Sequence, residues 1–293
     1  MSVDIHQVYK SSNIAELSPS IIYGLANVNA VRDVFENQTF SLSASSAYVK
    51  KTFAIPDDVD ANRITTGVTV DRDGSLRHVP TKIMRFNGRC CIEFRCFANS
   101  PLFIVSHSLT YADAVNHWAE DALNDMGSRM IIGIVGEHRI YPYESVTRAE
   151  FVSIVVRGLG LAPSPNSPLF EDVPISEPYA KEIAAAYACG LINGFKDGTF
   201  RPAEIITREQ AMVVVSKAMG MTGLRLDATD TDDTLPFEDA IRASAWARSS
   251  IAECLQAGIV SGRTLTKLAP RSSITRGEAA AIIQRLLKRS GMI

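Results

Sequence analysis

Apolar residues recur at the same offsets after three separate threonines in the second half of the chain. Counted from Thr147, Thr207 and Thr275, the residues four, seven, eight and twelve positions further on are apolar. Those residues are Phe151, Ile154, Val155 and Leu159; Ala211, Val214, Val215 and Met219; and Ala279, Ile282, Ile283 and Leu287. These offsets trace one stripe of an amphipathic helix. The pattern therefore predicts three equivalent helices, each of which buries one face.

The start of each predicted helix carries a capping pattern. Three residues after the threonines come Glu150, Gln210 and Glu278, which gives the T-x-x-E/Q signature of a helix N-terminus. We expect these three side chains to act as caps and nothing more. A proline also lies five residues before each threonine, at Pro142, Pro202 and Pro270. It is expected in an extended approach segment that cannot join the helix.

An arginine occupies the first helical position in all three copies. Arg148, Arg208 and Arg276 are 60 and 68 residues apart, a period suited to a two-helix repeat. A cation there adds to the positive end of the helix dipole, beside unpaired backbone N–H groups. The arrangement favours capture of an anion such as a carboxylate or phosphate. For any single arginine the alternative is an ion pair with a neighbouring acid, or a position in solvent.

A second helix is predicted upstream in each unit, around 117–128, 177–189 and 245–257. Each has one aromatic residue near its start, at Trp118, Tyr179 and Trp246. An aromatic-x-Asp step precedes each helix and ends at Asp113, Asp172 and Asp239, which we expect to be turn or capping residues. Units two and three share a G-[LI]-[IV]-x-G pair, Gly190 with Gly194 and Gly258 with Gly262. The first glycine of each pair is expected at a helix C-cap and the second in a tight turn.

These motifs, in this order, resemble the S-layer homology (SLH) domain. The resemblance covers about residues 111–290 in three tandem copies and includes Asp197-Gly-Thr-Phe200 and the [IV]-T-R-x-[EQ] steps. The stretch from Asp73 to Lys82 also looks like the module that precedes such repeats in many Gram-positive surface proteins. The family implies a pseudo-threefold helical bundle with grooves between neighbouring repeats. It also implies non-covalent anchoring on the cell wall.

The resemblance implies a partner and a set of binding residues. The partner is a secondary cell-wall polysaccharide that carries carboxylate groups, commonly pyruvate ketals on N-acetylmannosamine. The family's binding arginine maps to Arg148, Arg208 and Arg276, and its aromatic to Trp118, Tyr179 and Trp246, which would stack on sugar rings. Gly194 and Gly262 would let the backbone approach the sugar. The alternative for the aromatics is a place in the core. Arg208→Ala is expected to weaken binding and to leave the fold largely intact.

Units one and three depart from the family pattern. In unit one, Ile134 and His138 stand where the family has glycines, and Ile140 stands where it has Phe. We therefore expect unit one to be the weaker site. Unit three lacks D-G-T-F and has Gly277 in the first helical turn, which costs ~1 kcal/mol relative to Ala. The grooves are expected to be unequal, with at least one functional.

Composition narrows the class of protein. The 293 residues leave room for roughly two domains, and 46% of them are apolar. A net charge of −2 disfavours a nucleic-acid partner, and no apolar run is long enough for an ordinary transmembrane helix. The five histidines fall in no catalytic pattern, and no cofactor or metal motif is present, so neither catalysis nor a cofactor is predicted. The five cysteines are expected as buried or free thiols, with Cys189 and Cys254 on inner helix faces.

The first half of the chain is expected to be β-rich. The segment 14–35 could hold a short helix. The predicted strands are 39–43, 47–55, 66–70, 76–79, 82–86, 90–97 and 102–105, with turns at 71–74 and at Asn87-Gly88. A small antiparallel sheet or sandwich fits this pattern. The segment is expected to continue an upstream structure.

The sequence therefore predicts an α+β multidomain protein. Its expected parts are a poorly defined segment 1–37, a β-rich module 38–108, and SLH repeats at 109–163, 168–223 and 235–291. Cell-surface or cell-wall location follows from the resemblance, although no secretory signal is visible in the first thirty residues. The interpretations that remain are a C-terminal fragment of a longer secreted protein, a chain whose start site lies further upstream, or an intracellular or unexported copy. Two other functions stay open: a scaffold that binds no sugar, marked by arginines engaged by protein acids, or the C-terminal fragment of a wall-active glycoside hydrolase. The oligomeric state is not predicted.

Overall fold

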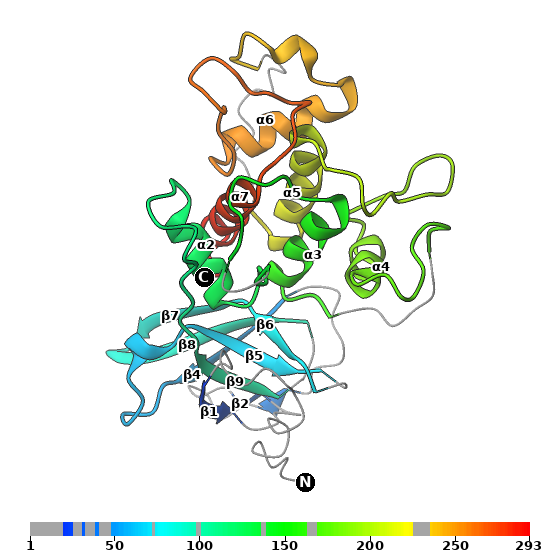
Figure 1. The fold of residues 1–293 in the computed structure, drawn as a ribbon. Helices are drawn as coiled ribbons and strands as arrows, with labels where there is room; N and C mark the ends of the chain where they lie inside the picture. Colours follow the sequence, from blue (N-terminus) through cyan, green and yellow to red (C-terminus); the bar gives the residue numbers. More distant parts are fainter. Residues whose placement is uncertain are drawn as a thin grey trace. The chain divides into compact units, whose positions relative to one another are not determined.

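The chain forms two compact units, Met1–Leu109 and Thr110–Ile293, each described here by itself. The computed structural model describes residues 48–71, 74–97, 101–135, 139–162, 169–224 and 235–293. For the strands at 20–25, 31–32 and 39–40 it describes the backbone alone. The first unit is built of antiparallel strands and the second of helices, so the predicted α+β class is confirmed (Figure 1).

The first unit contains two larger antiparallel sheets. One has the order β1 (Ser20–Leu25), β9 (Leu102–Ser106), β5 (Thr66–Val70) and β6 (Leu76–Val79). The other has the order β4 (Val49–Ala54), β8 (Arg89–Cys96) and β7 (Thr81–Phe86). Two short strands, β2 (Val31–Arg32) and β3 (Thr39–Phe40), pair separately, and a 3-10 turn spans Ala61–Arg63. Alternate residues of β8 point to one side, where Ile92 and Phe94 are fully buried in the core.

The predicted β-pattern is largely confirmed in this unit. Asn87 and Gly88 both have positive φ, 47° and 79°, as a two-residue hairpin turn requires. The short helix considered for 14–35 is wrong where that segment is described, because 20–25 and 31–32 are strands. Residues 41–43 and 47 of the predicted strands, and 72–73 of the predicted turn, lie outside the described residues.

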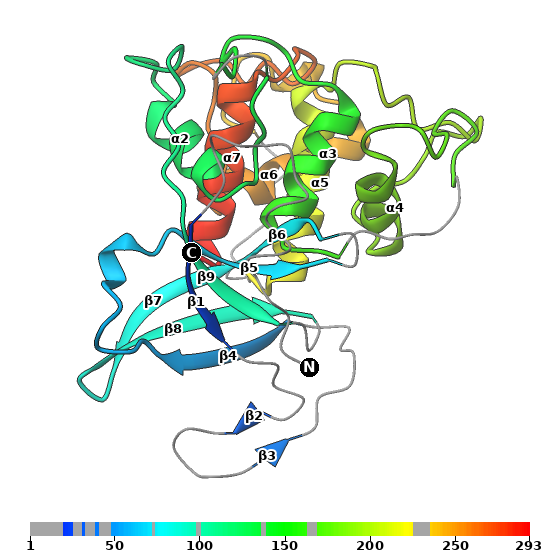
Figure 2. The same cartoon turned by 60° about the horizontal axis from the view of Figure 1, so that its bottom comes forward.

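The second unit pairs three long helices with three shorter ones. The long helices are α3 (Arg148–Gly158), α5 (Arg208–Thr222) and α7 (Arg276–Arg289), and they contact one another. The shorter helices are α2 (Glu120–Ser128), α4 (Ala180–Ala188) and α6 (Arg248–Gln256), with 3-10 turns η2 (Ala240–Arg242) and η3 (Ala245–Ala247) before α6. Figure 2 shows α2 beside α7, α4 beside α3 and α6 beside α5. Each short helix therefore packs on the long helix of a different repeat. In particular, α2 of the first repeat packs on α7 of the third repeat.

Three backbone hydrogen bonds tie the repeats into a closed ring. The N–H of Val146 donates to the carbonyl of Ile274 at 3.0 Å. The N–H of Ile274 donates to Ile206 at 3.3 Å, and that of Ile206 donates back to Val146 at 3.1 Å. All three residues are buried and stand just before the capping threonines. The segments that start the long helices are thus held together at one place.

The aspartates of the aromatic-x-Asp steps have the predicted backbone-capping role. Asp172 accepts hydrogen bonds from the N–H groups of Phe200 at 2.8 Å and Arg201 at 2.6 Å. Asp113 and Asp239 accept the equivalent pair of backbone hydrogen bonds in the first and third repeats. The second donor is left-handed in each unit, with φ of 50° at Tyr141, 61° at Arg201 and 57° at Ala269. The residue before each proline is therefore not in the extended conformation that the sequence predicted.

Gly277 lies where a side chain would collide with a neighbouring segment. A Cβ there would come within 2.7 Å of the ring of His117 and 3.2 Å of the carbonyl oxygen of Pro142. His117 is itself buried. The sequence-based view of Gly277 as a plain helix-propensity cost is therefore wrong, because close packing requires glycine.

Gly277→Ala is accordingly expected to lower the free energy of unfolding by about 1–3 kcal/mol, since over-packing a tight contact outweighs the gain in propensity. Gly220→Ala is the matched control, because a Cβ at that exposed position of α5 would meet nothing within 4 Å. It is expected to raise the free energy of unfolding by about 0.5–1 kcal/mol. Urea titrations of both variants measure the two values, and stabilisation by Gly277→Ala would contradict the packing explanation.

Candidate functional site

All three arginines reach across to the next repeat. Arg148 Nε donates to the carbonyl of Phe200 at 2.9 Å, and Arg208 Nε donates to Leu268 at 3.0 Å. Arg276 Nη1 donates to Ile140 at 3.4 Å, which closes the cycle. Each helix begins at its arginine, and the threonine before it caps the helix as predicted. One nitrogen of each guanidinium thus holds the following repeat's loop in place.

The backbone N–H groups at the helix starts are not available to a ligand. The N–H groups of Arg148 and Ala149 donate to carbonyl oxygens of Glu204 and Pro202 at 2.8 and 3.1 Å. The first two N–H groups of α5 and α7 are used in the same way, and each third one is capped by threonine. The expectation of unpaired N–H groups beside the anion is therefore wrong. Side chains alone remain to hold a ligand here.

Two of the three arginines are paired with protein carboxylates. Arg208 is buried, with 3% of its surface exposed, and its Nη1 lies 3.0 Å from Glu278 Oε1. Its Nη2 donates to the carbonyl of Ser261 at 3.1 Å. Arg276 Nε lies 2.6 Å from Glu150 and its Nη1 lies 3.0 Å from Glu144. These two arginines have the ion-paired environment that the sequence analysis named as the mark of a scaffold.

Arg148 is the exception. Within the described part of the chain no carboxylate lies within ion-pair distance of it, and its hydrogen bond to Phe200 uses only Nε. Its guanidinium carbon lies 4.8 Å from the ring centroids of both Phe195 and Phe200. Such contacts hold the cation by the faces of aromatic rings, which leaves the terminal nitrogens for an acceptor.

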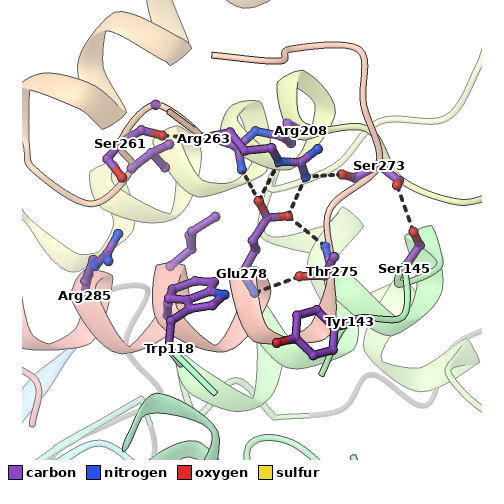
Figure 3. Close-up of a pocket in the computed structure, with 14 residues that line it drawn as sticks. Trp118, Tyr143, Ser145, Arg208, Ser261, Arg263, Ser273, Thr275, Glu278 and Arg285 are labelled. Atoms are coloured by element: carbon purple, nitrogen blue, oxygen red, sulfur yellow. Dashed lines mark hydrogen bonds and ion pairs between the residues drawn. The ribbon is translucent and has the colours of Figure 1, made fainter. Parts of the chain in front are cut away.

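A groove of about 580 Å³ surrounds Arg208 and is called the Arg208 groove below. The first repeat contributes Trp118, Tyr143 and Ser145 to this groove, and the second repeat contributes Arg208. The third repeat contributes the remaining residues. Figure 3 shows the Glu278 carboxylate hydrogen-bonded to the guanidinium groups of both Arg208 and Arg263. The rings of Trp118 and Tyr143 lie below these charged groups in this view and also line the groove. Arg263 also donates to Ser273 O at 2.7 Å. All three repeats contribute to this groove, beyond the two neighbours that the family pattern implied.

A second groove of about 300 Å³ surrounds Arg148 and is called the Arg148 groove. The second repeat supplies residues 191–195 and part of α5, and the third repeat supplies Trp246. Its lining contains two cations, Arg148 and Lys217, and no carboxylate among the described residues. Lys217 has no hydrogen-bond or ion-pair partner in the described part of the chain. This groove combines an aromatic ring with two cations that form no ion pair with a described carboxylate, although Glu204 and Asp172 act on Arg148 from a greater distance.

The two grooves correspond residue by residue. The α7 residues of the Arg208 groove and the α5 residues of the Arg148 groove stand 68 residues apart, the spacing of Thr275 and Thr207. Glu278 thereby matches Gln210, and Arg285 matches Lys217. The match of Arg285 with Lys217 was not predicted from the sequence. The signal was available, since a cation stands ten residues after every capping threonine: Arg157, Lys217 and Arg285.

The third equivalent position contains Arg276 and Tyr179. Arg157 lies 2.7 Å from Glu182, and its guanidinium carbon is 5.9 Å from the Tyr179 ring centroid. Burial raises the pKa of Tyr179, and the nearby charges of Glu150, Arg157, Glu182 and Arg276 act on it as well. Ile140 of unit one contacts Arg276 here. Of the departures of the first repeat, Ile140 therefore lies beside Arg276 and not beside Arg148. His138 lies outside the described residues.

The predicted aromatics differ in exposure. Trp118 is 60% exposed and Trp246 is 58% exposed, so the alternative that they are core residues is wrong for both. Tyr179 is half-buried. Both tryptophans line a groove, one each.

Gly194 and Gly262 line the grooves, but packing against protein already requires them to be glycine. A Cβ on Gly194 would lie 2.4 Å from the ring of Phe170, and one on Gly262 would lie 2.4 Å from the ring of Phe237. These rings belong to the aromatic-x-Asp steps. Gly190 and Gly258 have positive φ and follow α4 and α6, as the predicted C-cap position demands.

Glu150 and Glu278 do more than cap. Gln210 and Glu278 complete capping boxes, but Glu278 also pairs with Arg208 and Arg263. Glu150 pairs with Arg276, and no such box forms at α3. The expectation that these residues are caps only is thus wrong for two of the three positions.

Glu278 in the Arg208 groove and Asp239 in the same repeat both have lowered pKa values. Burial by itself raises the pKa of Glu278, but hydrogen bonds from Arg263 and Thr275 and the charge of Arg208 outweigh it, so the net pKa lies below 4.5. Burial also raises the pKa of Asp239, and the N–H groups of Leu268 and Ala269 bring it below 3.8. A carboxylate whose pKa is lower in the folded state than in the unfolded state stabilises the fold at pH values above its unfolded-state pKa. This stabilisation is lost as the pH falls through the folded-state pKa.

The free energy of unfolding is therefore expected to fall as pH drops below about 4.5, the ordinary pKa of Glu. Glu278→Gln should make this decline shallower, because one of the linked carboxylates is gone. Urea midpoints of both proteins between about pH 3 and 7 measure the slopes. Equal slopes would contradict the role assigned to Glu278.

The remaining features offer no second centre in the described residues. There, no cluster of His, Cys, Asp or Glu has the grouping of a metal site. Of the helices in the described ranges, none has the length and apolarity needed to cross a membrane. Cys254 is buried as expected, whereas Cys189 at the end of α4 is exposed, so its predicted inner position is wrong.

Known proteins resemble large parts of this chain, and the family match lies in the second unit. A sequence profile of the S-layer homology domain matches residues 169–212 and 236–280. The amylopullulanase of Thermoanaerobacterium thermosulfurigenes is 36% identical over 203 residues, 69% of this chain and 11% of that protein. The exoglucanase XynX of Acetivibrio thermocellus is 33% identical over 191 residues, 65% of this chain and 17% of that protein. The cellulosome-anchoring protein of Acetivibrio thermocellus is 30% identical over 152 residues, 50% of this chain and 33% of that protein.

The chain thus spans between 11% and 33% of the length of these relatives. The profile match and the surface proteins among the relatives confirm the predicted location at the cell surface or cell wall, and they support a role in cell-wall anchoring. The protein is an S-layer homology domain protein, with repeats matched at residues 169–212 and 236–280.

Proposed function

We propose that the second unit anchors its protein on the cell wall by binding an anionic secondary polysaccharide. The observation that carries this proposal is the Arg148 groove, where Arg148 and Lys217 have no carboxylate partner among the described residues and the exposed Trp246 stands beside them. A carboxylated sugar matches both features, because its acid seeks the cations and its C–H face packs on the ring. A pyruvate ketal is the acidic group that fits the family resemblance.

The proposed mechanism assigns a role to each side chain. The terminal nitrogens of Arg148 donate to the carboxylate, while Nε stays on the carbonyl of Phe200 and fixes the direction of the fork. Lys217, three turns along α5, supplies a second positive charge. Trp246 stacks on the sugar ring. The unit acts by binding alone, as expected of an anchoring domain.

We also propose that the three repeats form a pseudo-threefold bundle. The closed ring of hydrogen bonds among Val146, Ile206 and Ile274 supports this arrangement. So does the matching contact of each arginine with the next repeat. Such a bundle presents several grooves to one polymer, and engagement of more than one raises overall affinity.

A scaffold role has some support at two of the three positions, since Arg208 and Arg276 are paired with protein acids. A sedimentation assay on isolated Gram-positive sacculi separates the two functions. The chain is expected to bind intact sacculi and to lose binding after chemical removal of the pyruvylated polysaccharide. Lys217→Ala is expected to weaken binding about tenfold without a change in folding. No binding to intact sacculi would leave the scaffold interpretation in place.

A further inference from the structure

The residue three positions after each capping threonine separates the grooves chemically. Glu278 pairs with Arg208 at 3.0 Å, and Glu150 pairs with Arg276 at 2.6 Å. Gln210 makes no such pair with Arg148, and among the described residues its Oε1 accepts a hydrogen bond only from the N–H of Thr207, at 3.1 Å. The three arginines are alike in sequence and in their contact with the next repeat's carbonyl. Whether each arginine is paired with an acid corresponds to the residue at this one position, which is Glu for the paired arginines and Gln for Arg148.

A carboxylate already bound to an arginine occupies the place that a ligand carboxylate would take. All three nitrogens of Arg208 donate to protein acceptors: the carbonyl of Leu268, Glu278 and the carbonyl of Ser261. A ligand acid must displace Glu278, which leaves a half-buried carboxylate with fewer partners. The terminal nitrogens of Arg148 carry no such acid in the described residues. Direct contact of a ligand carboxylate with the arginine at the helix start is therefore open in the Arg148 groove and blocked in the Arg208 groove.

Net charge does not explain this difference. The Arg208 groove is lined by Arg208, Arg263 and Arg285 against one acid, Glu278, and the Arg148 groove by two cations with no acid. Both linings thus carry the same formal charge. What differs is whether the arginine at the helix start can donate to a ligand acid, since Arg285 in one groove and Lys217 in the other both have no carboxylate partner among the described residues. The Arg208 groove instead offers two exposed aromatic faces, Trp118 and Tyr143, together with serine hydroxyls. Those groups suit a sugar that carries no acid.

We propose that this position selects the charge of the bound sugar. Gln210 makes the Arg148 groove the site for the acidic sugar, and Glu278 makes the Arg208 groove a site for a sugar without an acidic group. The inference rests on the proposed function and specifies how the grooves divide the polymer between them. Glu150, with Glu144, closes the third arginine to acids in the same way.

The chain contains two tryptophans, and each lines one groove, so their indole N–H signals in NMR spectra report the grooves separately. The probes are the pyruvate ketal of methyl N-acetylmannosaminide and its neutral methyl ester. In the wild-type chain, the Trp246 signal is expected to respond to the acid with about tenfold higher affinity than to the ester. The Trp118 signal should respond to both with similar affinity.

Reciprocal variants test the selector. Gln210→Glu should weaken acid binding at Trp246 about tenfold, because by correspondence with Glu278 the new carboxylate reaches Arg148. Glu278→Gln should create acid preference at Trp118, and Gln210 demonstrates that Gln in this position caps an equivalent helix. Thermal unfolding checks the fold of each variant.

The outcomes are distinguishable. Acid affinity at Trp246 that stays within about twofold in Gln210→Glu would overturn the selector while leaving the proposed function standing. Equal acid preference at both tryptophans of the wild-type chain would do the same. No response of either signal to the acid in the wild-type chain would overturn the proposed function as well.

Discussion

Arg208→Ala is expected to lower the free energy of unfolding by about 3 kcal/mol, because it removes one donor from the half-buried carboxylate of Glu278 and leaves two carbonyl groups without this donor. Arg208 is 3% exposed and contacts Leu268, Ser261 and Glu278. Arg263 retains Glu278 in the variant, which keeps the loss below that of a fully orphaned charge. Urea unfolding followed by circular dichroism measures the change.

Lys217→Ala is the matched control for this prediction. It removes a cation from the other groove that has no ion pair or hydrogen bond in the described residues, so its unfolding free energy should stay within about 0.5 kcal/mol of wild type. A stable Arg208→Ala variant with impaired wall binding would instead restore the sequence-based expectation that Arg208 serves the ligand and not the fold.

Asp172→Ala is expected to have an effect of similar size, about 3 kcal/mol, since two hydrogen bonds to a carboxylate are lost together. The bonds hold Phe200 and Arg201, and Arg201 has a left-handed backbone that is strained for a residue with a side chain. Phe200 is fully buried, and its carbonyl holds Arg148 in place. The damage should therefore reach the Arg148 groove.

Asp172→Asn keeps one carbonyl acceptor and is expected to lose about half as much stability. Chemical unfolding of both variants gives the two values, and the Trp246 indole signal reports whether the groove is altered. Full stability of Asp172→Ala would show that the loop holds its left-handed turn without the carboxylate.

Local patterns in the sequence were enough to predict where the three long helices begin, whereas the three shorter helices begin three residues later than predicted. The offsets after Thr147, Thr207 and Thr275 and the T-x-x-E/Q steps depend on contacts within one helix, and the helices begin where these signals place them. The Asn87-Gly88 turn is equally local, because two left-handed residues suffice to define it.

What the sequence could not predict depends on contacts between repeats. The pairing of Arg208 with Glu278 joins residues 70 positions apart, and that of Arg276 with Glu150 joins residues 126 positions apart. The crossing of α2 onto α7 has the same origin. Gly277 shows the consequence, since its need for glycine comes from His117, far away in the chain. Helix propensity alone predicts that alanine at position 277 would raise the free energy of unfolding, which is the opposite of the effect expected from packing.

The candidate site was partly visible in the sequence. Arg148, Trp246 and the capping threonines stand out by repetition, and the structure brings Arg148 and Trp246 into one groove. Lys217 escaped notice although Arg157 and Arg285 share its register. The inequality of the three arginines could not be foreseen, because it depends on which acid each meets after folding. Their assignment as ligand-binding residues remains a prediction.

The most direct test of the central claim is the affinity of the chain for purified secondary wall polysaccharide, measured by calorimetry before and after mild acid removal of its ketal-linked pyruvate. An affinity that falls at least about tenfold after the removal, with Lys217→Ala weakened on the intact polymer and unaffected on the stripped one, is the predicted result. An affinity that is the same for intact and stripped polymer would contradict recognition of an anionic sugar by Arg148 and Lys217.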